Sequence, residues 1–576
     1  SSVNFTSGTL NTSVLFGNGG AGSDLIANTT YYVRARAVNI GGTPTGYTST
    51  ISTVTLVYTP SDGSPLFPTV YTSSITFSWG SNNNPSGTLY QAEISTDNFS
   101  TLNTFTQNTS NSALFGTGGV GAALTSNTTY YFRAKAISHS ALSSAYGSIA
   151  STPTYASVPG VGSPIFPNVD LSSVTFRWGN GGNPNGTLYR AEVSTDNFST
   201  VYTTSQTSET SVLFGTGGAG SALTQNTTFY FRVKAINHAG LLSPYAATQS
   251  TLTLTAVPSD GVPIFPSVDT SSITVKWGAN NNPSWTDYRV ELSTDSFSTL
   301  NIDSATRNVT MLFGTGGLGS ALTSNTTYYF RVKAINVLGQ QTGYGTMSAT
   351  ATLSQAPSGP DFMSVELSSV VFVWTGNNPV GTIYHAQIST DNFSTVNVTS
   401  VTKNAKAHFG SGGVGEALLA NTTHYFRVRA INHNSLLTGF AVTAATVTAV
   451  NPPTSPAFSG VQITSVVFSW DANGNGPNTR YEAQISSDSF ATLNFASGTH
   501  NTSTLFGAGG AGQNLSANTT YYFRVKAFNQ AGSPTSYTSM VSTITLVYAP
   551  GIGAPIFPTV NESSITFSWS NPGNPQ

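Results

Sequence analysis

A glycine-rich hexad is the motif that comes closest to a known chemistry. Gly116, Gly118 and Gly121 have the spacing of the dinucleotide-binding fingerprint, in which a helix N-terminus after the glycines meets a pyrophosphate. We expect a turn whose glycines adopt positive φ, and no bound nucleotide, because a strand-like segment follows the glycines where the fingerprint needs a helix. The same hexad recurs along the chain, beginning at Gly17, Gly215, Gly314, Gly410 and Gly507.

Acidic and histidine side chains offer few catalytic combinations. Glu93 and Asp97 are four strand residues apart, about 13 Å, whereas glycosidases place their two carboxyl groups roughly 5 to 9.5 Å apart. Asp97 alone gives too few carboxylates for calcium, so we expect a turn residue there. His139, His238 and His433 take one loop position in different repeats and cannot meet at one metal ion. With no cysteine and no Ser-His-Asp set within a repeat, we expect a protein that is not an enzyme, without catalytic residues, metal sites or cofactors.

The low content of charged residues argues against two classes of partner, nucleic acids and anionic membranes. Charged residues make up 7% of the chain and the net charge is −2, whereas an ordinary soluble domain has about 25% charged residues. A binder of nucleic acid or anionic membranes would need a basic patch, so we expect no nucleic-acid partner. We also expect no membrane span in this segment, because no uncharged apolar run approaches the roughly 18 residues that a span requires.

A repeat of about 98 residues organises the chain of 576 residues. One tryptophan marks each repeat, at Trp79, Trp178, Trp277, Trp374, Trp470 and Trp569, and Trp285 is off the pattern. The period is too long for a helical solenoid unit of roughly 20 to 50 residues and has the size of a small domain. We therefore expect tandem domains.

Each repeat has the pattern of β-strands. Residues 74–79 and 90–94 alternate apolar and polar side chains, with turn residues between them. The longest such segment, 130–137, puts Tyr130 and Phe132 on one face and Tyr131 and Arg133 on the other. No stretch sustains a 3.6-residue period, and several short strands with one buried face predict a β-sandwich.

The repeats resemble the fibronectin type III domain, as found in tandem in very large surface or fibre proteins of bacterial type. The resemblance rests on Trp79 closing one strand, Tyr90 opening the next, the corner Leu124–Tyr130 and the strand ending Ala235–Asn237. An added glycine-rich segment before the corner departs from the family pattern. The resemblance implies an all-β tandem array of fibronectin type III-like, immunoglobulin-like β-sandwiches, arranged as beads on a string. It also implies a set of structural core residues: Trp79, Trp178, Trp277, Trp374, Trp470, Trp569, Tyr130 and Tyr328.

Seven segments follow from the repeat, numbered here one to seven as domains in chain order. Five are complete modules, and the first and last hold only the C-terminal half and the N-terminal strands of a module. The expected boundaries are 1–58, 59–157, 158–255, 256–354, 355–450, 451–548 and 549–576. Because both ends fall inside a module, we expect the sequence to be a window on a longer protein.

One charged set should project from the outer face of each sandwich. Glu93 on one strand and Arg133 and Lys135 on its neighbour should pair across the strands, worth roughly 0.2 to 1 kcal/mol each, rather than form a ligand site. The set recurs as Glu192, Arg232 and Lys234 and as Glu291, Arg331 and Lys333, and Gln387 and Gln484 replace the acid later.

Sequons are dense in the sequence. The Asn-Thr-Thr tripeptides are candidate glycosylation sites if the protein is secreted by a host that glycosylates them, at Asn28, Asn127, Asn226, Asn325, Asn421 and Asn518.

The expected function is mechanical: a non-catalytic, extracellular or cell-surface structural repeat protein that forms a stalk, surface fibre or filament. Its expected partners are the neighbouring modules and other copies of itself. Two alternatives stay open. One is an adhesin that binds glycans or a partner surface, and the other is the spacer region of a modular secreted hydrolase.

Overall fold

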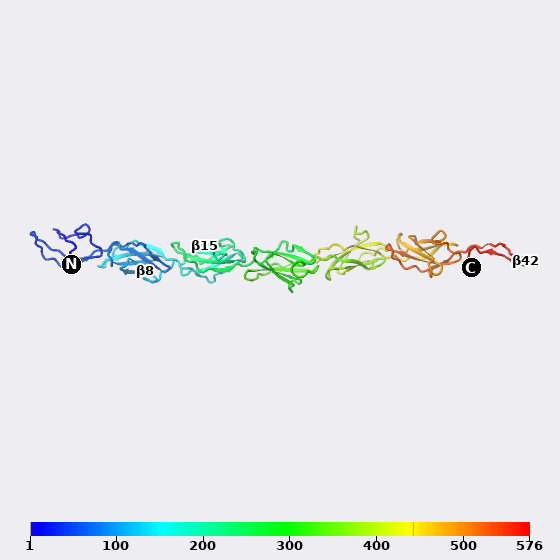
Figure 1. The fold of residues 1–576 in the computed structure, drawn as a ribbon, viewed down its shortest axis with the longest axis horizontal. Helices are drawn as coiled ribbons and strands as arrows, with labels where there is room; N and C mark the ends of the chain where they lie inside the picture. Colours follow the sequence, from blue (N-terminus) through cyan, green and yellow to red (C-terminus); the bar gives the residue numbers. More distant parts are fainter. Residues whose placement is uncertain (1, 442, 576) are drawn as a thin grey trace. The chain divides into compact units, whose positions relative to one another are not determined.

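The computed structural model describes residues 2–441 and 443–575, which form strands and turns but no helix (Figure 1). The chain divides into two compact units. The first runs to Val257 and includes the loops Ala279–Asp287 and Ala334–Gly343. The second holds Pro258–Gly278, Tyr288–Lys333 and the chain from Tyr344 onward.

Domain two, in the first unit, is built from two antiparallel sheets. One has the order β10-β9-β6-β7, with β6 at Leu89–Ser95, β7 at Thr104–Asn108, β9 at Thr129–Ile137 and β10 at Ala150–Pro153. In the other, β5 pairs with each of its partners, with β3 at Ser61–Asp62, β4 at Thr69–Val70, β5 at Ser74–Gly80 and β8 at Ser112–Gly116.

Domain three repeats this arrangement within the first unit. Its larger sheet has the order β15-β14-β17-β18, with β14 at Leu188–Ser194, β15 at Thr203–Thr207, β17 at Thr228–Ile236 and β18 at Gln249–Leu252. The other sheet comprises β11 at Gly160–Val161, β12 at Asn168–Val169, β13 at Ser173–Gly179 and β16 at Ser211–Gly215. Domain one contributes the pair β1 at Thr30–Val33 and β2 at Ile51–Val54.

Domains four and five follow a similar plan. Domain five lies in the second unit, and so does domain four apart from its loops Ala279–Asp287 and Ala334–Gly343. Domain four has β19 at Ser259–Asp260, β20 at Ser267–Val268, β21 at Ser272–Gly278, β22 at Asp287–Ser293, β23 at Ile302–Thr306, β24 at Thr310–Gly314, β25 at Thr327–Ile335 and β26 at Ser348–Ala351. Domain five has β27 at Ser358–Val365, β28 at Ser369–Thr375, β29 at Ile383–Ser389, β30 at Val398–Thr402, β31 at Lys406–Gly410, β32 at Thr423–Ile431 and β33 at Ala444–Val447.

The remaining strands belong to domains six and seven. Domain six has β34 at Thr454–Val461, β35 at Ser465–Asp471, β36 at Arg480–Ser486, β37 at Phe495–Thr499, β38 at Ser503–Gly507, β39 at Thr520–Phe528 and β40 at Val541–Ile544. Domain seven has β41 at Gly551–Ile552, β42 at Thr559–Asn561, β43 at Ser564–Thr566 and β44 at Trp569–Ser570. The all-β sandwich array expected from the sequence is confirmed.

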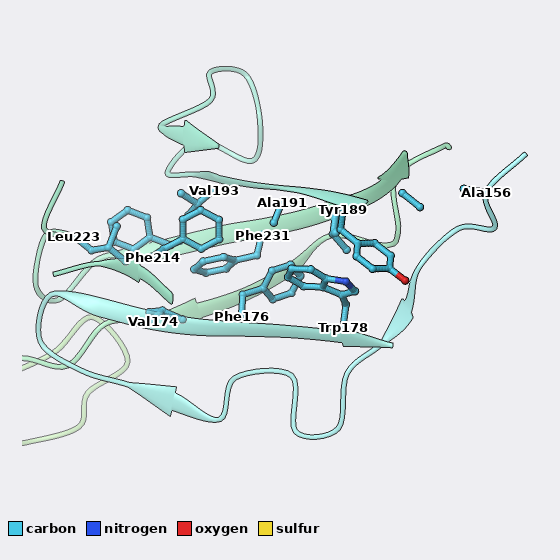
Figure 2. Packing of buried hydrophobic residues seen from close by; sticks show 13 residues of the cluster. Ala156, Val174, Phe176, Trp178, Tyr189, Ala191, Val193, Phe214, Leu223 and Phe231 are labelled. Carbon is cyan, nitrogen blue, oxygen red and sulfur yellow. The ribbon is translucent and has the colours of Figure 1, made fainter. Parts of the chain in front are cut away.

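The core of each complete domain is an aromatic cluster between its two sheets. Figure 2 shows the cluster of domain three, where Phe176 and Trp178 on β13 face Tyr189 on β14 and Phe231 on β17. The ring centroids of Trp178 and Tyr189 are 5.7 Å apart and those of Phe176 and Phe231 are 5.3 Å apart. The alternating pattern of β17, with every second side chain buried, produces this layer because successive strand residues point to opposite faces.

Most of the expected core residues lie inside these clusters. Trp79, Trp178, Trp277, Trp374 and Trp470 are at most 5% exposed, and Tyr130 and Tyr328 are each 5% exposed. Trp569 is different, because it is 61% exposed. Its strand β44 pairs with β41, and the residues of domain seven that the structure describes form two-stranded sheets that leave the indole uncovered.

The glycine-rich hexad forms a turn, as expected. Gly116, Gly118 and Gly121 have φ of 91°, 79° and 84°. The amide of Val120 donates to the carbonyl of Leu114 at 2.9 Å, so the loop folds back on its own strand. A Cβ on Gly119 would lie 2.2 Å from the carbonyl oxygen of Leu114, so this close approach requires glycine.

Candidate functional site

A buried asparagine lies where two successive domains meet, and both polar atoms of its side chain form hydrogen bonds across the joint. Asn127 lies in the loop before β9 of domain two and is 1% exposed. Its Nδ2 donates to Thr187 Oγ1 of domain three at 2.9 Å. Its Oδ1 accepts the backbone N–H of His238, also of domain three, at 2.8 Å. One side chain therefore fastens two separate loops of the following domain.

The same arrangement occurs five times, always within one compact unit. The side-chain Nδ2 of each asparagine donates to a threonine 57 to 60 residues further on, in the pairs Asn28–Thr88, Asn127–Thr187, Asn226–Thr286, Asn325–Thr382 and Asn421–Thr479. The Oδ1 of each accepts a backbone N–H, from His139, His238, Val337, His433 and Gln530 in turn. We call these five the joint asparagines and number the joints one to five in chain order.

Asparagine suits this position for two reasons. Its amide supplies one donor and one acceptor from a short side chain, and the joint uses both. The joint asparagines also have φ between 47° and 50°, a left-handed conformation that asparagine tolerates better than most residues. A neutral hydrogen bond contributes about 0.5 to 1.5 kcal/mol, and leaving a buried partner unpaired costs about 1 to 3 kcal/mol.

A second buried asparagine holds the linker between domains. Asn183, in the loop between β13 and β14, accepts the N–H of Ser157 at 2.8 Å and donates to the carbonyl of Ser157 at 2.9 Å. This two-point contact fixes the backbone of the linker against the domain that follows. It recurs as Asn84 with Tyr58, Asn282 with Ala256, Asn378 with Gln355, Asn475 with Asn451 and Asn574 with Tyr548.

The charged set expected on the outer face exists, but its acid is buried. Glu93 and Arg133 are cross-strand neighbours on β6 and β9, and Arg133 donates from Nε to Glu93 Oε2 at 2.8 Å. Tyr146 Oη and Gln91 Nε2 donate to Glu93 Oε1 at 2.5 and 2.6 Å. Together they cover the carboxylate, which leaves Glu93 2% exposed. Lys135 lies beside this cluster, with Nζ 5.1 Å from the ring centroid of Tyr146.

The electrostatics of this cluster are those of a structural ion pair. Burial alone would raise the pKa of Glu93, but hydrogen bonds from Tyr146, Arg133 and Gln91 outweigh it and lower the pKa. Burial and the hydrogen bond to Glu93 raise the pKa of Tyr146 to about 12. Both carboxylate oxygens of Glu93 are therefore engaged within the domain, by Arg133, Tyr146 and Gln91. Gln387 and Gln484 take the place of Glu93 in domains five and six and accept from Arg427 and Arg524.

Asp97 is a turn residue, as expected. Its Oδ1 accepts from the Thr101 N–H at 2.8 Å and from Ser95 Oγ at 2.7 Å, and its Oδ2 accepts from Thr101 Oγ1 at 2.7 Å. These hydrogen bonds, the backbone bond from Thr101 first, lower the pKa of Asp97 to about 2. The turn recurs with Asp196, Asp295, Asp391 and Asp488.

The histidines singled out in the sequence lie at separate joints. His139, His238 and His433 each donate a backbone N–H to a joint asparagine, so their shared loop position reflects the joint. Among residues 2–441 and 443–575, no three potential metal-ligating side chains come together. None of the described segments forms a helix with the length and apolarity that a membrane crossing would need.

The joint was not predicted from the sequence as a contact. Five of the six Asn-Thr-Thr tripeptides singled out as candidate glycosylation sites supply the joint asparagines, and Asn518 of the sixth is exposed. Glycosylation of these residues stays a prediction. In the structure, Asn127 is 1% exposed and its Nδ2 lies against Thr187, so the folded joint leaves no room for a glycan on Nδ2. The sequence signal that could have indicated the joint is the recurrence of the same tripeptide in each repeat, because a loop without tertiary contacts is not constrained to keep one sequence.

The fold and its joints define an array of fibronectin type III-like β-sandwiches. Residues 258–349 and 451–543 match the fibronectin type III domain family. A crystal structure of chicken CNTN1 FN1-FN3 domains aligns with 50% of this chain and 98% of its own, at 15% identity and a TM-score of 0.19. No curated protein matches the sequence.

Proposed function

We propose that this chain is a non-catalytic, extracellular structural repeat protein that acts as a stalk, surface fibre or filament, of the kind found in very large bacterial-type surface proteins. The observation that carries the proposal is the joint asparagine. A buried side chain with both amide atoms hydrogen-bonded across each joint resists bending between neighbouring domains, which a load-bearing or spacing element requires.

The surface chemistry supports the same role. Charged groups are few, and in the ion pair between Glu93 and Arg133 the acid is buried within its own domain. Because exposed charges are sparse, the spacing and solubility of the array should depend little on salt. The proposed partners are neighbouring domains and other copies of the chain.

The test is solution scattering on the full chain and on a variant in which Asn127, Asn226, Asn325 and Asn421 are all changed to alanine. We expect the variant to be more flexible, with a shorter mean end-to-end distance, while far-ultraviolet circular dichroism stays unchanged. The matched control changes Asn98, Asn197 and Asn392 to alanine, because these asparagines are exposed in turns within single domains. Equal flexibility in all three proteins would contradict the proposal.

Three further observations separate this role from the alternatives. Binding of the full chain to a glycan array would favour an adhesin. Electron microscopy of the native source should show the domains in continuous fibres or stalks outside the cell. A catalytic domain encoded in the same protein would favour a spacer in a secreted hydrolase.

A further inference from the structure

The third joint, between domains three and four, is built differently from the others. Trp285 occupies the loop position that is Gly87, Gly186 or Gly381 in other domains. Its indole Nε1 donates to the backbone carbonyl of the joint asparagine Asn226 at 3.3 Å. Both residues belong to the first compact unit. Trp285 is 47% exposed, so about half of its side chain is covered.

A second difference lies in the loop after β25. At joints two, four and five, an asparagine in the equivalent loop donates back to the preceding domain, from Asn237 to Thr154, from Asn432 to Thr352 and from Asn529 to Val447. At joint three the equivalent Asn336 donates to Gln340 Oε1 at 3.0 Å, within its own loop. The hydrogen bond that this loop makes elsewhere is therefore redirected at joint three.

We propose that Trp285 is the positioning residue of the third joint. It supplies from its indole N–H the cross-joint hydrogen bond that the loop asparagine supplies at joints two, four and five. The indole is a donor only, and it meets a backbone carbonyl that is already held by the burial of Asn226. Through Asn226, Trp285 acts on the second contact of the joint, the Val337 N–H that donates to Asn226 Oδ1 at 3.0 Å.

This inference rests on the proposed function, in which joint asparagines couple the domains. It adds that the coupling at joint three depends on an aromatic residue, whereas joint two depends on Asn237. Joint three should therefore be weakened by substitution of Trp285 and not of its loop asparagine, whereas joint two should be weakened by substitution of its loop asparagine. That difference gives a test in which each joint is the control for the other.

The experiment is hydrogen exchange measured by mass spectrometry on the full chain. We expect Trp285→Gly, which restores the glycine of domains two, three and five, to accelerate exchange of the Val337 amide by about fivefold or more. We expect Asn336→Ala to leave it unchanged. At joint two the loop asparagine makes the cross-joint hydrogen bond, so Asn237→Ala should accelerate exchange of the His238 amide. Unchanged exchange in β21 and β25 shows that domain four remains folded in the Trp285 and Asn336 variants, and unchanged exchange in β13 and β17 shows the same for domain three in Asn237→Ala.

Two variants separate the possible failures. Trp285→Phe keeps the ring but loses the N–H and should also accelerate exchange at Val337. If Trp285→Gly accelerates exchange and Trp285→Phe does not, the hydrogen-bond assignment is overturned. Unchanged exchange at Val337 in both Trp285 variants would overturn the positioning role and leave the half-exposed indole free for other contacts. Asn226→Ala tests the proposed function itself, because unchanged exchange at Val337 in that variant means that the joint asparagine does not couple the domains.

Discussion

The guanidinium carbon of Arg133 lies 4.0 Å from the ring centroid of Phe99 and 3.9 Å from that of Tyr146. Phe99 has a φ of 66°, which is unusual for an aromatic residue. The contact between the Arg133 guanidinium and the Phe99 ring therefore offsets the backbone strain at Phe99, in the turn that follows β6. The same arrangement recurs with Phe198 and Arg232, Phe297 and Arg331, Phe393 and Arg427, and Phe490 and Arg524.

The first prediction concerns the coupling of Phe99 and Arg133. A double-mutant cycle with Phe99→Ala and Arg133→Gln should give a coupling energy of about 0.5 to 2 kcal/mol, because the cation is partly desolvated between two rings. Hydrogen exchange of buried β9 amides measures the free energy of unfolding of this domain. Leu102→Ala, an exposed residue of the same turn, is the control and should show no coupling with Arg133. Additive effects of Phe99 and Arg133 would contradict the prediction.

The second prediction concerns Glu93. Glu93→Gln should be tolerated with a loss under about 1 kcal/mol, because Gln387 and Gln484 hold the matching arginines in other domains. Glu93→Ala should cost about 1 to 3 kcal/mol, since it leaves half-buried donors of Arg133 and Tyr146 without their acceptor. The pKa of Tyr146, raised to about 12, should fall toward its ordinary value in both variants. Hydrogen exchange measures the stability, and NMR titration of the tyrosine ring carbon measures the pKa.

The domain fold could be predicted because its signals are local. The alternation in 130–137 places Tyr130 and Phe132 inside whatever the neighbouring strands are, and the repeat gives the domain length. The burial of Glu93 could not be predicted from that alternation, because its position points outward. The carboxylate is covered by Tyr146, which lies 53 residues further on in the loop after β9 and donates a hydrogen bond to it.

The joint could not be predicted for a related reason. The partners of Asn127 lie 60 and 111 residues further on, in two loops of another domain. Their approach depends on how two folded domains dock, and neutral asparagine and threonine carry no charge pattern that marks a contact. The tripeptide was visible in the sequence, but its pairing with Thr187 was not.

The third prediction concerns pH and domain five. His424 takes the position of Tyr130, whose hydroxyl accepts the Thr125 N–H at 2.9 Å, and His424 is 3% exposed. Burial lowers the pKa of His424, and the backbone of Leu419 opposes that shift only in part. The unfolded chain therefore binds the proton more readily than the folded domain. The free energy of unfolding of domain five should therefore carry no penalty from His424 above about pH 6.5 and should decrease as the pH drops below that value.

The control for this prediction is His424→Tyr, which restores the tyrosine of domains two, four and six. It should remove this part of the pH dependence and leave domain two unaffected. Hydrogen exchange of buried amides in β29 and β9, followed between pH 5 and 8 and corrected for intrinsic rates, compares the two domains. A pH dependence in β29 that is the same in the parent and in His424→Tyr would show that another group is responsible.

The fourth prediction concerns the acid limit of the turns. Asp97 has a pKa of about 2, held there first by the backbone hydrogen bond from Thr101 and then by the Thr101 and Ser95 side chains. Because the folded pKa lies below the ordinary value, the turn is stabilised above about pH 4 and loses that stabilisation as the pH falls toward 2. NMR titration of the carboxyl carbon measures the pKa. Thr101→Val removes one donor and should raise the pKa of Asp97, while Asp196 keeps its low value in the same sample.

The last prediction concerns the sequons. In a glycosylating host, Asn98, which is exposed in its turn, should carry glycan more fully than Asn127, whose Nδ2 is buried against Thr187. A sugar on Asn127 is incompatible with the folded joint, so any molecules that carry one should show faster exchange of the His238 amide. Glycopeptide mass spectrometry measures occupancy at both sites in one digest. Full occupancy of Asn127 with a protected His238 amide would contradict the joint geometry.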